Sequence, residues 1–193
     1  MATRKLIRVS EPPQGLVYVP DFISVDEETD LLNIFSELEF KDFVLQGQAA
    51  KRKVYYYGYR YEFYTQHVQP SEEFPDWLKA LRERAAPLAG LKAEEMEQAL
   101  IGHYAPGAGI GWHRDAPAFG PTVVGISLAS DDVMRFRKTL ENSIEHYKQP
   151  LAKRSLYVLS GPARSLWQHS VAPVKETRYS ITLRTVKERF RTA

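Results

Sequence analysis

The half of the chain after Lys92 consists of short segments rich in β-branched and aromatic residues, separated by Gly, Pro and Asp. Several short segments at this spacing are typical of the strands of a β-sandwich or barrel. Six strands are predicted, at residues 97–104, 122–128, 133–138, 154–160, 165–171 and 178–187. This half of the chain is therefore expected to be almost entirely β-structure.

The half before Lys92 has the pattern of two amphipathic helices. Ser24 is followed by Glu27 three residues later, which is a capping box and predicts the start of a helix. Pro75 suits the first turn of a second helix, and Gly90 suits its exit. The Arg-rich tail after Val186 is expected to be a loose end. The chain is thus predicted to place helices first and strands afterwards.

The composition narrows the possible chemistry. The chain has 193 residues, an ordinary size for one domain, and it contains no cysteine. The absence of cysteine excludes a disulfide scaffold, a Cys-ligated zinc or iron–sulfur site and a thiol nucleophile. No apolar run approaches the roughly 20 residues of a membrane span, and the first residues lack the apolar stretch of a signal peptide. A cytoplasmic protein that does not enter a membrane is expected.

The charge is unevenly distributed along the chain. The formal net charge is only +2, yet residues 11–45 carry nine acids and one base. That segment has a net charge of −8, so the remainder of the chain carries +10. Such asymmetry indicates that one side of the molecule binds a polyanion. A mixed, solvated surface is the alternative.

A His-x-Asp motif predicts a metal site. Residues two apart on a strand point to the same face, so His113 and Asp115 can offer a nitrogen and an oxygen to one ion. His169, in the predicted strand 165–171, can complete the set. Two histidines and one carboxylate, with open positions on the metal, form the facial triad of non-haem Fe(II) oxygenases. These three residues are the predicted metal ligands and catalytic centre.

The last predicted strand carries two arginines on one face. Alternation places Arg178 and Arg184 on the same side as Ser180 and Thr182. Guanidinium groups donate two parallel hydrogen bonds to a carboxylate, so two of them can hold a small dicarboxylate between them. 2-Oxoglutarate is such a dianion. A half-exposed strand with solvated arginines is the alternative.

Taken together, these motifs resemble the AlkB family of Fe(II)/2-oxoglutarate dioxygenases, over roughly residues 100–187. The resemblance is carried by His113-x-Asp115, by His169, by Arg178 and Arg184 six residues apart, and by Tyr104-Ala-Pro-Gly107 just before the first histidine. It implies an α+β, mainly β fold: a double-stranded β-helix (jelly roll) with N-terminal helices packed on one sheet. One domain is expected over residues 1–193, with a helical and lid part at about 1–92 and a jelly-roll catalytic core at about 93–188.

The resemblance also implies roles for single residues. His113, Asp115 and His169 would bind Fe(II). Arg178 would pair with the distal carboxylate of 2-oxoglutarate, and Arg184 would support the carboxylate near the iron. Tyr104 would donate a hydrogen bond to this cosubstrate.

Two positions depart from the family pattern. Gly102 and Ser180 stand where the family often has asparagine. Serine can still donate one hydrogen bond to the cosubstrate, whereas glycine has no side chain to do so. The polar contacts to 2-oxoglutarate are therefore expected to be fewer or rearranged.

The activity implied by the resemblance is oxidative dealkylation of nucleobases. With Fe(II), 2-oxoglutarate and O₂, the N-alkyl group is hydroxylated and lost as an aldehyde. The expected partner is alkylated DNA or RNA, met as a single strand or a flipped base, and the protein is expected to be a monomer. A tRNA-modifying hydroxylase or a protein demethylase or hydroxylase with the same chemistry is the alternative, and a non-catalytic jelly-roll binding module is a further one.

Basic and aromatic side chains are mixed in residues 51–61, which in the family form part of a lid over the target nucleotide. Bases attract phosphate and aromatic rings stack on nucleobases. The candidate nucleic-acid contacts are Lys51, Arg52, Lys53, Tyr55, Tyr57 and Tyr59. A hairpin that is rich in Tyr for its strand propensity is the alternative. The segment also resembles the tRNA-modifying AlkB homologue, which keeps RNA open as a substrate.

Three residues beside the predicted ligands complete the set of candidates. Arg114 is expected to face away from the metal and to contact either a phosphate or a carboxylate. Trp167 lies two residues before His169, so on a regular strand it would share that face and could line the pocket, with core packing as the alternative. Trp112 is expected to point away from the metal into the core.

Overall fold

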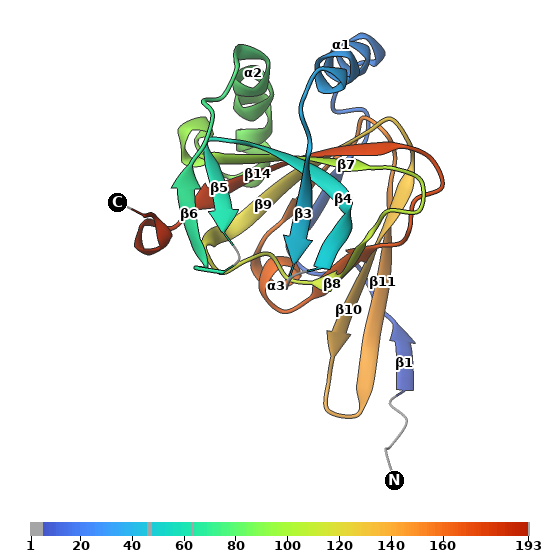
Figure 1. Ribbon diagram of the computed structural model, residues 1–193. Coiled ribbons are helices and arrows are strands. Elements are labelled where there is room, and N and C mark those ends of the chain that lie inside the picture. Colours follow the sequence, from blue (N-terminus) through green and yellow to red (C-terminus); the bar gives the residue numbers. More distant parts are fainter. Residues whose placement is uncertain (1–5, 46–47, 63, 193) are drawn as a thin grey trace.

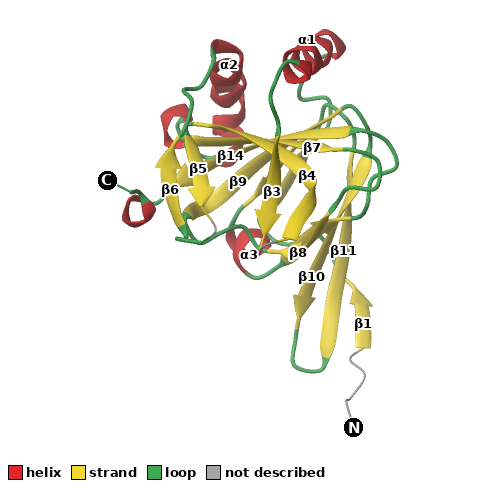
Figure 2. Ribbon diagram, viewed as in Figure 1, coloured by secondary structure: helices red, strands yellow, loops and turns green. Residues whose placement is uncertain are grey.

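The computed structural model describes residues 6–45, 48–62 and 64–192. Two β-sheets form the body of the molecule, and two helices lie over the outer face of the larger one (Figure 1; Figure 2). This is the predicted jelly roll, α+β and mainly β, with its N-terminal helices on one sheet.

The larger sheet has seven strands and contains most of the predicted ones. Its order is β2 (Leu16–Val19), β12 (Leu156–Leu159), β9 (Phe119–Leu128), β14 (Arg178–Val186), β7 (Gln98–Tyr104), β4 (Gln48–Tyr57) and β3 (Lys41–Leu45). All of its pairings are antiparallel.

The smaller sheet has five strands. Its order is β1 (Leu6–Val9), β11 (Ser143–Leu151), β10 (Asp132–Thr139), β13 (Gln168–Val171) and β8 (Ile110–His113). β1 pairs with β11 in parallel, and the other neighbours are antiparallel. A separate hairpin joins β5 (Tyr59–Glu62) to β6 (His67–Pro70). β11 is a long strand that the sequence pattern did not predict.

The helices begin where the sequence predicts. α1 (Val25–Ser36) starts at a complete capping box: Ser24 Oγ accepts from the Glu27 N–H at 3.1 Å, and Glu27 Oε2 accepts from the Ser24 N–H at 2.8 Å. α2 (Asp76–Ala85) follows Pro75, and Gly90 closes the turn after it with a φ of +65°. The shorter helical turns are η1 (Ala86–Ala89), η2 (Ala93–Glu95), α3 (Gly161–Ser165) and η3 (Glu188–Phe190). In the described part of the chain, no helix is both long and apolar enough to cross a bilayer.

Strand alternation divides the core into two layers. In β9, Val124 and Ile126 face the helices and pack against Phe35 of α1 and Leu78 of α2. Val123 faces the other way, into the space between the sheets, where it joins a second apolar cluster with residues of β10 and β12. The larger sheet is therefore buried on both faces, which makes it a rigid support for side chains that point between the sheets.

Two expectations about the C-terminal third were wrong. The strand predicted at residues 165–171 begins only at Gln168, because the helix α3 extends to Ser165, with Pro162 in its first turn. The tail after Val186 is held rather than loose. Arg191 forms a 2.7 Å ion pair with Glu97, and Lys187 Nζ donates to the Pro117 carbonyl at 2.8 Å.

Candidate active site

Three side chains that can ligate a metal meet between the ends of the two sheets. His113 ends β8, and His169 on β13 lies directly opposite it in register, with the two ring centroids 4.2 Å apart. Asp115 lies two residues beyond the end of β8 rather than on the strand. One ligand atom from each of the three residues lies within 4.8 Å of the others. The structure therefore assembles the predicted triad, although the strand carries only one of the two residues in the His-x-Asp motif.

The protonation states suit a metal. Burial lowers the pKa of His169 to about 3 and also lowers the pKa of His113, so both imidazoles are neutral at neutral pH. Gly111 O lies 2.8 Å from His113 Nδ1, which favours a proton on Nδ1 and leaves Nε2 as the ligand atom.

The carboxylate of the triad is ionised, and only one of its two oxygens accepts a hydrogen bond. Burial alone would raise the pKa of Asp115, but the Arg184 guanidinium and the two imidazoles hold it well below its usual range. Asp115 Oδ1 accepts from Arg184 Nη2 at 2.8 Å, whereas the buried Oδ2 has no hydrogen-bond partner. A buried carboxylate oxygen without a partner costs free energy, and a divalent cation would remove that cost. The donor set fits Fe(II). The hydrogen bond from Arg184 holds the Asp115 carboxylate in the orientation that a metal ligand needs.

A small cavity of about 40 Å³ extends from the triad between the sheets. Its lining includes the predicted cosubstrate residues Tyr104, Arg178, Ser180 and Arg184. Arg178 is only 2% exposed; its Nη2 donates to Ser127 Oγ at 2.8 Å, and its Nε has no partner. Among the described residues, no carboxylate lies within ion-pair distance of Arg178. Because an uncompensated buried charge costs several kcal/mol, this residue indicates an anionic ligand.

Arg52 also belongs to this cavity, although its place in a basic segment suggested a nucleic-acid contact. It lies on β4 directly opposite Tyr104 on β7, and its Nη1 donates to Tyr104 Oη at 3.0 Å. Burial alone would raise the pKa of Tyr104, but Arg52 and Arg178 hold it below its usual value. This placement follows from the register, since every second residue of β4 points between the sheets. Arg52 also lines the wide cavity above the triad, so its nucleic-acid contact stays a prediction. Alternation within residues 51–61 would have separated the two faces, but only the register shows which face is buried.

The two departures from the family pattern are neighbours. Gly102 on β7 and Ser180 on β14 are paired in register. A Cβ at Gly102 would lie 2.9 Å from Ser180 Oγ and 3.1 Å from a ring carbon of Tyr104. The glycine therefore leaves room for Tyr104 and the side chains around it, and a larger residue would force these groups to move.

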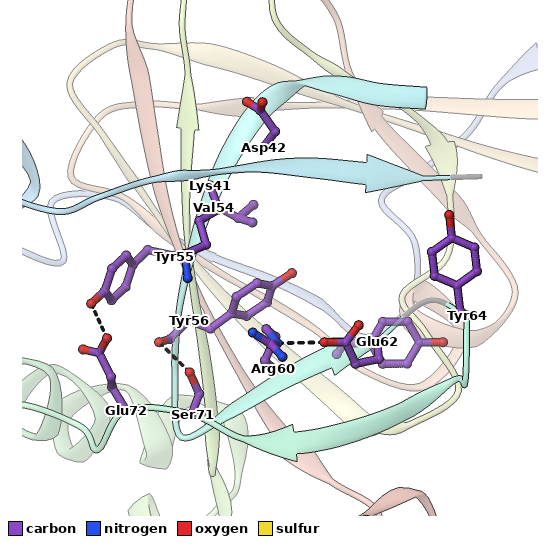
Figure 3. A pocket seen from close by; sticks show the side chains of 11 residues that line it. Lys41, Asp42, Val54, Tyr55, Tyr56, Arg60, Glu62, Tyr64, Ser71 and Glu72 are labelled. Carbon is purple, nitrogen blue, oxygen red and sulfur yellow. Dashed lines mark hydrogen bonds and ion pairs between the residues drawn. The ribbon is translucent and has the colours of Figure 1, made fainter. Parts of the chain in front are cut away.

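A wide cavity of about 700 Å³ opens above the triad, lined in part by Tyr56, Tyr61, Phe119 and the metal-binding segment. A neighbouring cavity of about 320 Å³ shares Tyr56 and Tyr61 with it (Figure 3). Figure 3 shows Tyr55 turned toward Glu72, whose Oε1 accepts from Tyr55 Oη at 2.6 Å, while Tyr56 extends to the other side of β4. Tyr56 is therefore the aromatic residue of β4 that faces the triad.

Several of the predicted nucleic-acid contacts lie elsewhere. Tyr55 lies outside the wide cavity, Tyr57 is buried under the helices, and Tyr59 Oη accepts from Arg191 in the tail at 3.2 Å. Lys53 is exposed and its role stays a prediction, whereas the side chain of Lys51 lies outside the described residues. Because side chains alternate along a strand, Tyr56 faces the wide cavity, whereas its neighbours Tyr55 and Tyr57 face the other side of β4.

The three candidates beside the ligands also have definite places. Trp167 is 4% exposed and belongs to the core between the sheets, where it lies in one apolar cluster with Met134 and Phe136 of β10, so the core-packing alternative holds. Arg114 is exposed, lines the wide cavity and donates to the Leu166 carbonyl at 3.3 Å. Trp112 is not a core residue; it is half-buried beneath Arg135 and Arg137.

The site defines a class of protein, and comparison with known proteins agrees with it. The chain belongs to the 2OG-Fe(II) oxygenase superfamily, whose model matches residues 15–190. Enzymes of this class use Fe(II), 2-oxoglutarate and O₂. The chain is a dioxygenase of the AlkB-like branch, because its relatives include AlkB and ALKBH proteins.

One relative is the tRNA (carboxymethyluridine(34)-5-O)-methyltransferase alkbh8 of Xenopus tropicalis, which is 30% identical over 182 residues. That match covers 91% of this chain but only 28% of the relative. The probable RNA/DNA demethylase ALKBH6 of Danio rerio is 29% identical over 153 residues, covering 79% of this chain and 62% of that protein. The solved structure of OsALKBH1 superposes with a TM-score of 0.71 at 14% identity, covering 91% of this chain and 98% of that one, which supports the fold.

Proposed function

We propose that this dioxygenase removes N-alkyl groups from nucleobases of DNA or RNA. The observation that carries the proposal is the position of the triad between the small cavity and the wide cavity. On one side is a small cavity with the buried Arg178 guanidinium, which has no carboxylate partner among the described residues and can bind 2-oxoglutarate. On the other is a wide, aromatic-lined cavity large enough for a base. The names of the relatives, which refer to tRNA and to an RNA/DNA demethylase, support a nucleic-acid substrate.

In this proposal His113, Asp115 and His169 hold the iron. Arg184 fixes Asp115 by binding Oδ1, so that Oδ2 is presented to the metal. When iron, 2-oxoglutarate and O₂ are bound, the centre oxidises 2-oxoglutarate to succinate and CO₂ and places an oxygen atom in a C–H bond of the alkyl group. The resulting N-hydroxyalkyl group leaves as an aldehyde and restores the base.

The side chains around the small cavity hold the cosubstrate. Arg178 pairs with the distal carboxylate, and Arg52 and Tyr104 close the cavity on the β4–β7 side. The target base enters the wide cavity, where Tyr56 and Tyr61 offer rings for stacking. Stacking requires the base to leave the duplex or to come from a single strand.

Anaerobic reconstitution tests the cosubstrate assignment. Fe(II) with 2-oxoglutarate is expected to give a visible charge-transfer band, and O₂ is then expected to yield succinate. Both signals should be lost in His113→Ala and Arg178→Ala. Succinate formation at the wild-type rate in either variant would refute the assignment.

Product formation on methylated substrates tests the target. Methylated single-stranded DNA, duplex DNA, tRNA and a methylated protein are compared under matched conditions. Release of formaldehyde with a nucleic acid supports the proposal, whereas product only with the protein refutes it.

A tRNA-modifying hydroxylase is the second candidate. It is favoured by the match to the tRNA-modifying relative along 91% of this chain. Mass spectrometry separates the two candidates, because a hydroxylase leaves a nucleoside heavier by one oxygen atom, whereas dealkylation leaves the unmodified base and an aldehyde.

A further inference from the structure

The outer face of the smaller sheet carries a basic and aromatic cluster that the reaction described above does not use. Met134 and Phe136 of β10 point into the core, so Arg135 and Arg137 point outward. We call this surface the Trp112 face, and it consists of Trp112, Arg114, Arg135, Arg137, His146 and Lys148.

Both arginines of β10 lie against the indole ring of Trp112. The guanidinium carbon of Arg137 is 4.6 Å from the ring centroid and that of Arg135 is 5.4 Å from it. His146 meets the same indole edge-on, with the ring centroids 6.2 Å apart. A guanidinium that stacks on an aromatic ring keeps its N–H donors at its edge, where they remain available for bidentate binding of a phosphate.

The charge of this face is not neutralised within the protein. Basic side chains elsewhere form ion pairs with acids, such as Lys138 with Glu145 and Arg84 with Glu27. In the described part of the chain, no ion pair involves Arg135, Arg137 or Lys148. The outward positions of β10 and β11 contain no acid, since Glu145 lies on the opposite face and pairs with Lys138.

The face leads directly to the active site. Trp112, Arg114 and Arg135 line the wide cavity above the triad. Arg135 also lines a second cavity of about 660 Å³, whose lining contains Lys148, Lys153 and Lys175 as well as the acids Asp131, Asp132 and Glu176. Figure 1 shows that β10 and β11 extend beyond the body of the molecule, so a chain that leaves the wide cavity can follow their outer face.

We propose that the Trp112 face binds the phosphate backbone of the single-stranded nucleic acid that flanks the target nucleotide. The inference rests on the proposed function, because it requires a nucleic-acid substrate. Arg135, Arg137 and Lys148 contact phosphates, while Trp112 holds the two guanidiniums in place. Charge complementarity selects this occupant: an unneutralised basic surface beside the substrate cavity matches a polyanion.

Binding of short, unmodified, fluorescently labelled single-stranded RNA and DNA oligonucleotides tests this surface without any chemistry. The affinity of the Fe(II)- and 2-oxoglutarate-loaded protein under anaerobic conditions is measured by anisotropy between about 50 and 200 mM salt. Arg135→Gln/Arg137→Gln should weaken binding roughly tenfold at low salt and reduce the salt slope by about 1 to 2. The matched control, Lys79→Gln/Lys92→Gln, removes the same charge beside the helices of the larger sheet and should change affinity less than about twofold. The tighter of the two oligonucleotides identifies RNA or DNA as the preferred source of phosphate.

Two further variants separate charge from packing. Trp112→Leu keeps every basic side chain but removes the ring against which Arg135 and Arg137 lie. It should therefore weaken oligonucleotide binding while leaving the salt slope unchanged. The exposed Lys148→Gln should reduce the slope without lowering the melting temperature, which keeps the test valid if the double arginine variant folds poorly.

The outcomes distinguish this inference from the function on which it rests. If the wild-type protein binds neither oligonucleotide at low salt, the nucleic-acid function fails together with this surface. If the wild type binds but Lys148→Gln and Arg135→Gln/Arg137→Gln behave like the control variant, only the Trp112 face is refuted.

Discussion

The small cavity and the wide cavity share the metal site, but they are built in different ways. The small cavity lies between the sheets and is lined by neighbours in the register of β4, β7 and β14, so its charged groups are buried and held by hydrogen bonds. The wide cavity is open, and its lining comes from several strands and loops. Where a charge is buried, its chemistry strongly restricts the ligand, because an unpaired buried charge is costly. Where side chains are exposed, only the direction in which each one points limits its role.

Loss of a metal ligand should have the largest effect, because both cavities depend on the ion. His169→Ala is expected to weaken Fe(II) binding by about 100-fold or more. Titration with Fe(II) under anaerobic conditions measures this. His103→Ala is the control, since His103 stacks on Tyr179 and lies outside the triad. Equal metal affinity in the two variants would contradict the ligand assignment.

Removal of the buried charge at Arg178 should affect only the small cavity. In the wild type with Mn(II), 2-oxoglutarate at about 100 times its Kd should stabilise the fold by about 2.7 kcal/mol. Arg178→Met should lose this gain, because the distal carboxylate has no partner, and melting temperatures with and without 2-oxoglutarate measure it. Arg84→Met, on the surface of α2, should keep the full gain. A ligand-dependent shift in Arg178→Met as large as in the wild type would place the cosubstrate elsewhere.

Substitutions at adjacent residues of β4 should have different effects on 2-oxoglutarate binding, because one side chain points between the sheets and the next points to solvent. Arg52→Met removes a charged hydrogen-bond donor from the small cavity and should raise the KM for 2-oxoglutarate by about tenfold, as expected for a loss of about 1.5 kcal/mol. Lys53→Met, one residue away and exposed, should leave that KM unchanged. A change of the same size in both variants would show that neither position is specific to the cosubstrate.

The smallest effect is expected in the wide cavity. Tyr56→Ala should weaken the binding of a methylated oligonucleotide by roughly fivefold, because stacking on one ring contributes about 1 kcal/mol or more. Binding of 2-oxoglutarate should not change, which distinguishes loss of stacking from a general distortion. Tyr55→Ala, whose side chain faces Glu72 instead, should bind the oligonucleotide as the wild type does. A larger loss in Tyr55→Ala than in Tyr56→Ala would reverse the assignment of the two faces of β4.

The parts of the structure that depend on local chemistry could be predicted from the sequence. The capping box at Ser24 and Glu27 forms within four residues, so it defines the start of α1 without knowledge of the rest of the fold. The alternation of β14 likewise placed Arg178 and Arg184 on one face. His113 and Asp115 could be paired from their spacing, because a chain segment two residues long can bring both to one ion.

The errors occurred where a role depends on a distant strand. Trp167 was a candidate for the pocket, but it packs with Phe136 of β10 in the core between the sheets and lines neither cavity at the triad. Tyr55 and Tyr57 could not be told from Tyr56 without knowing which face of β4 meets β7 and the metal-binding segment. Trp112 points outward, yet its contacts are two arginines of β10, a strand with which β8 is not directly paired.

The sequence by itself determined the residue types of the triad, the shared face of Arg178 and Arg184 and the starts of the helices, because these follow from side-chain chemistry and from contacts within a few residues. Only the tertiary structure showed that Arg52 lines the small cavity, that Trp167 belongs to the core and that Arg135 and Arg137 lie against Trp112. The physical reason is that burial and register arise from pairings between strands far apart in the chain. A one-residue change of register exchanges the two faces of a strand, and the local sequence does not determine that register.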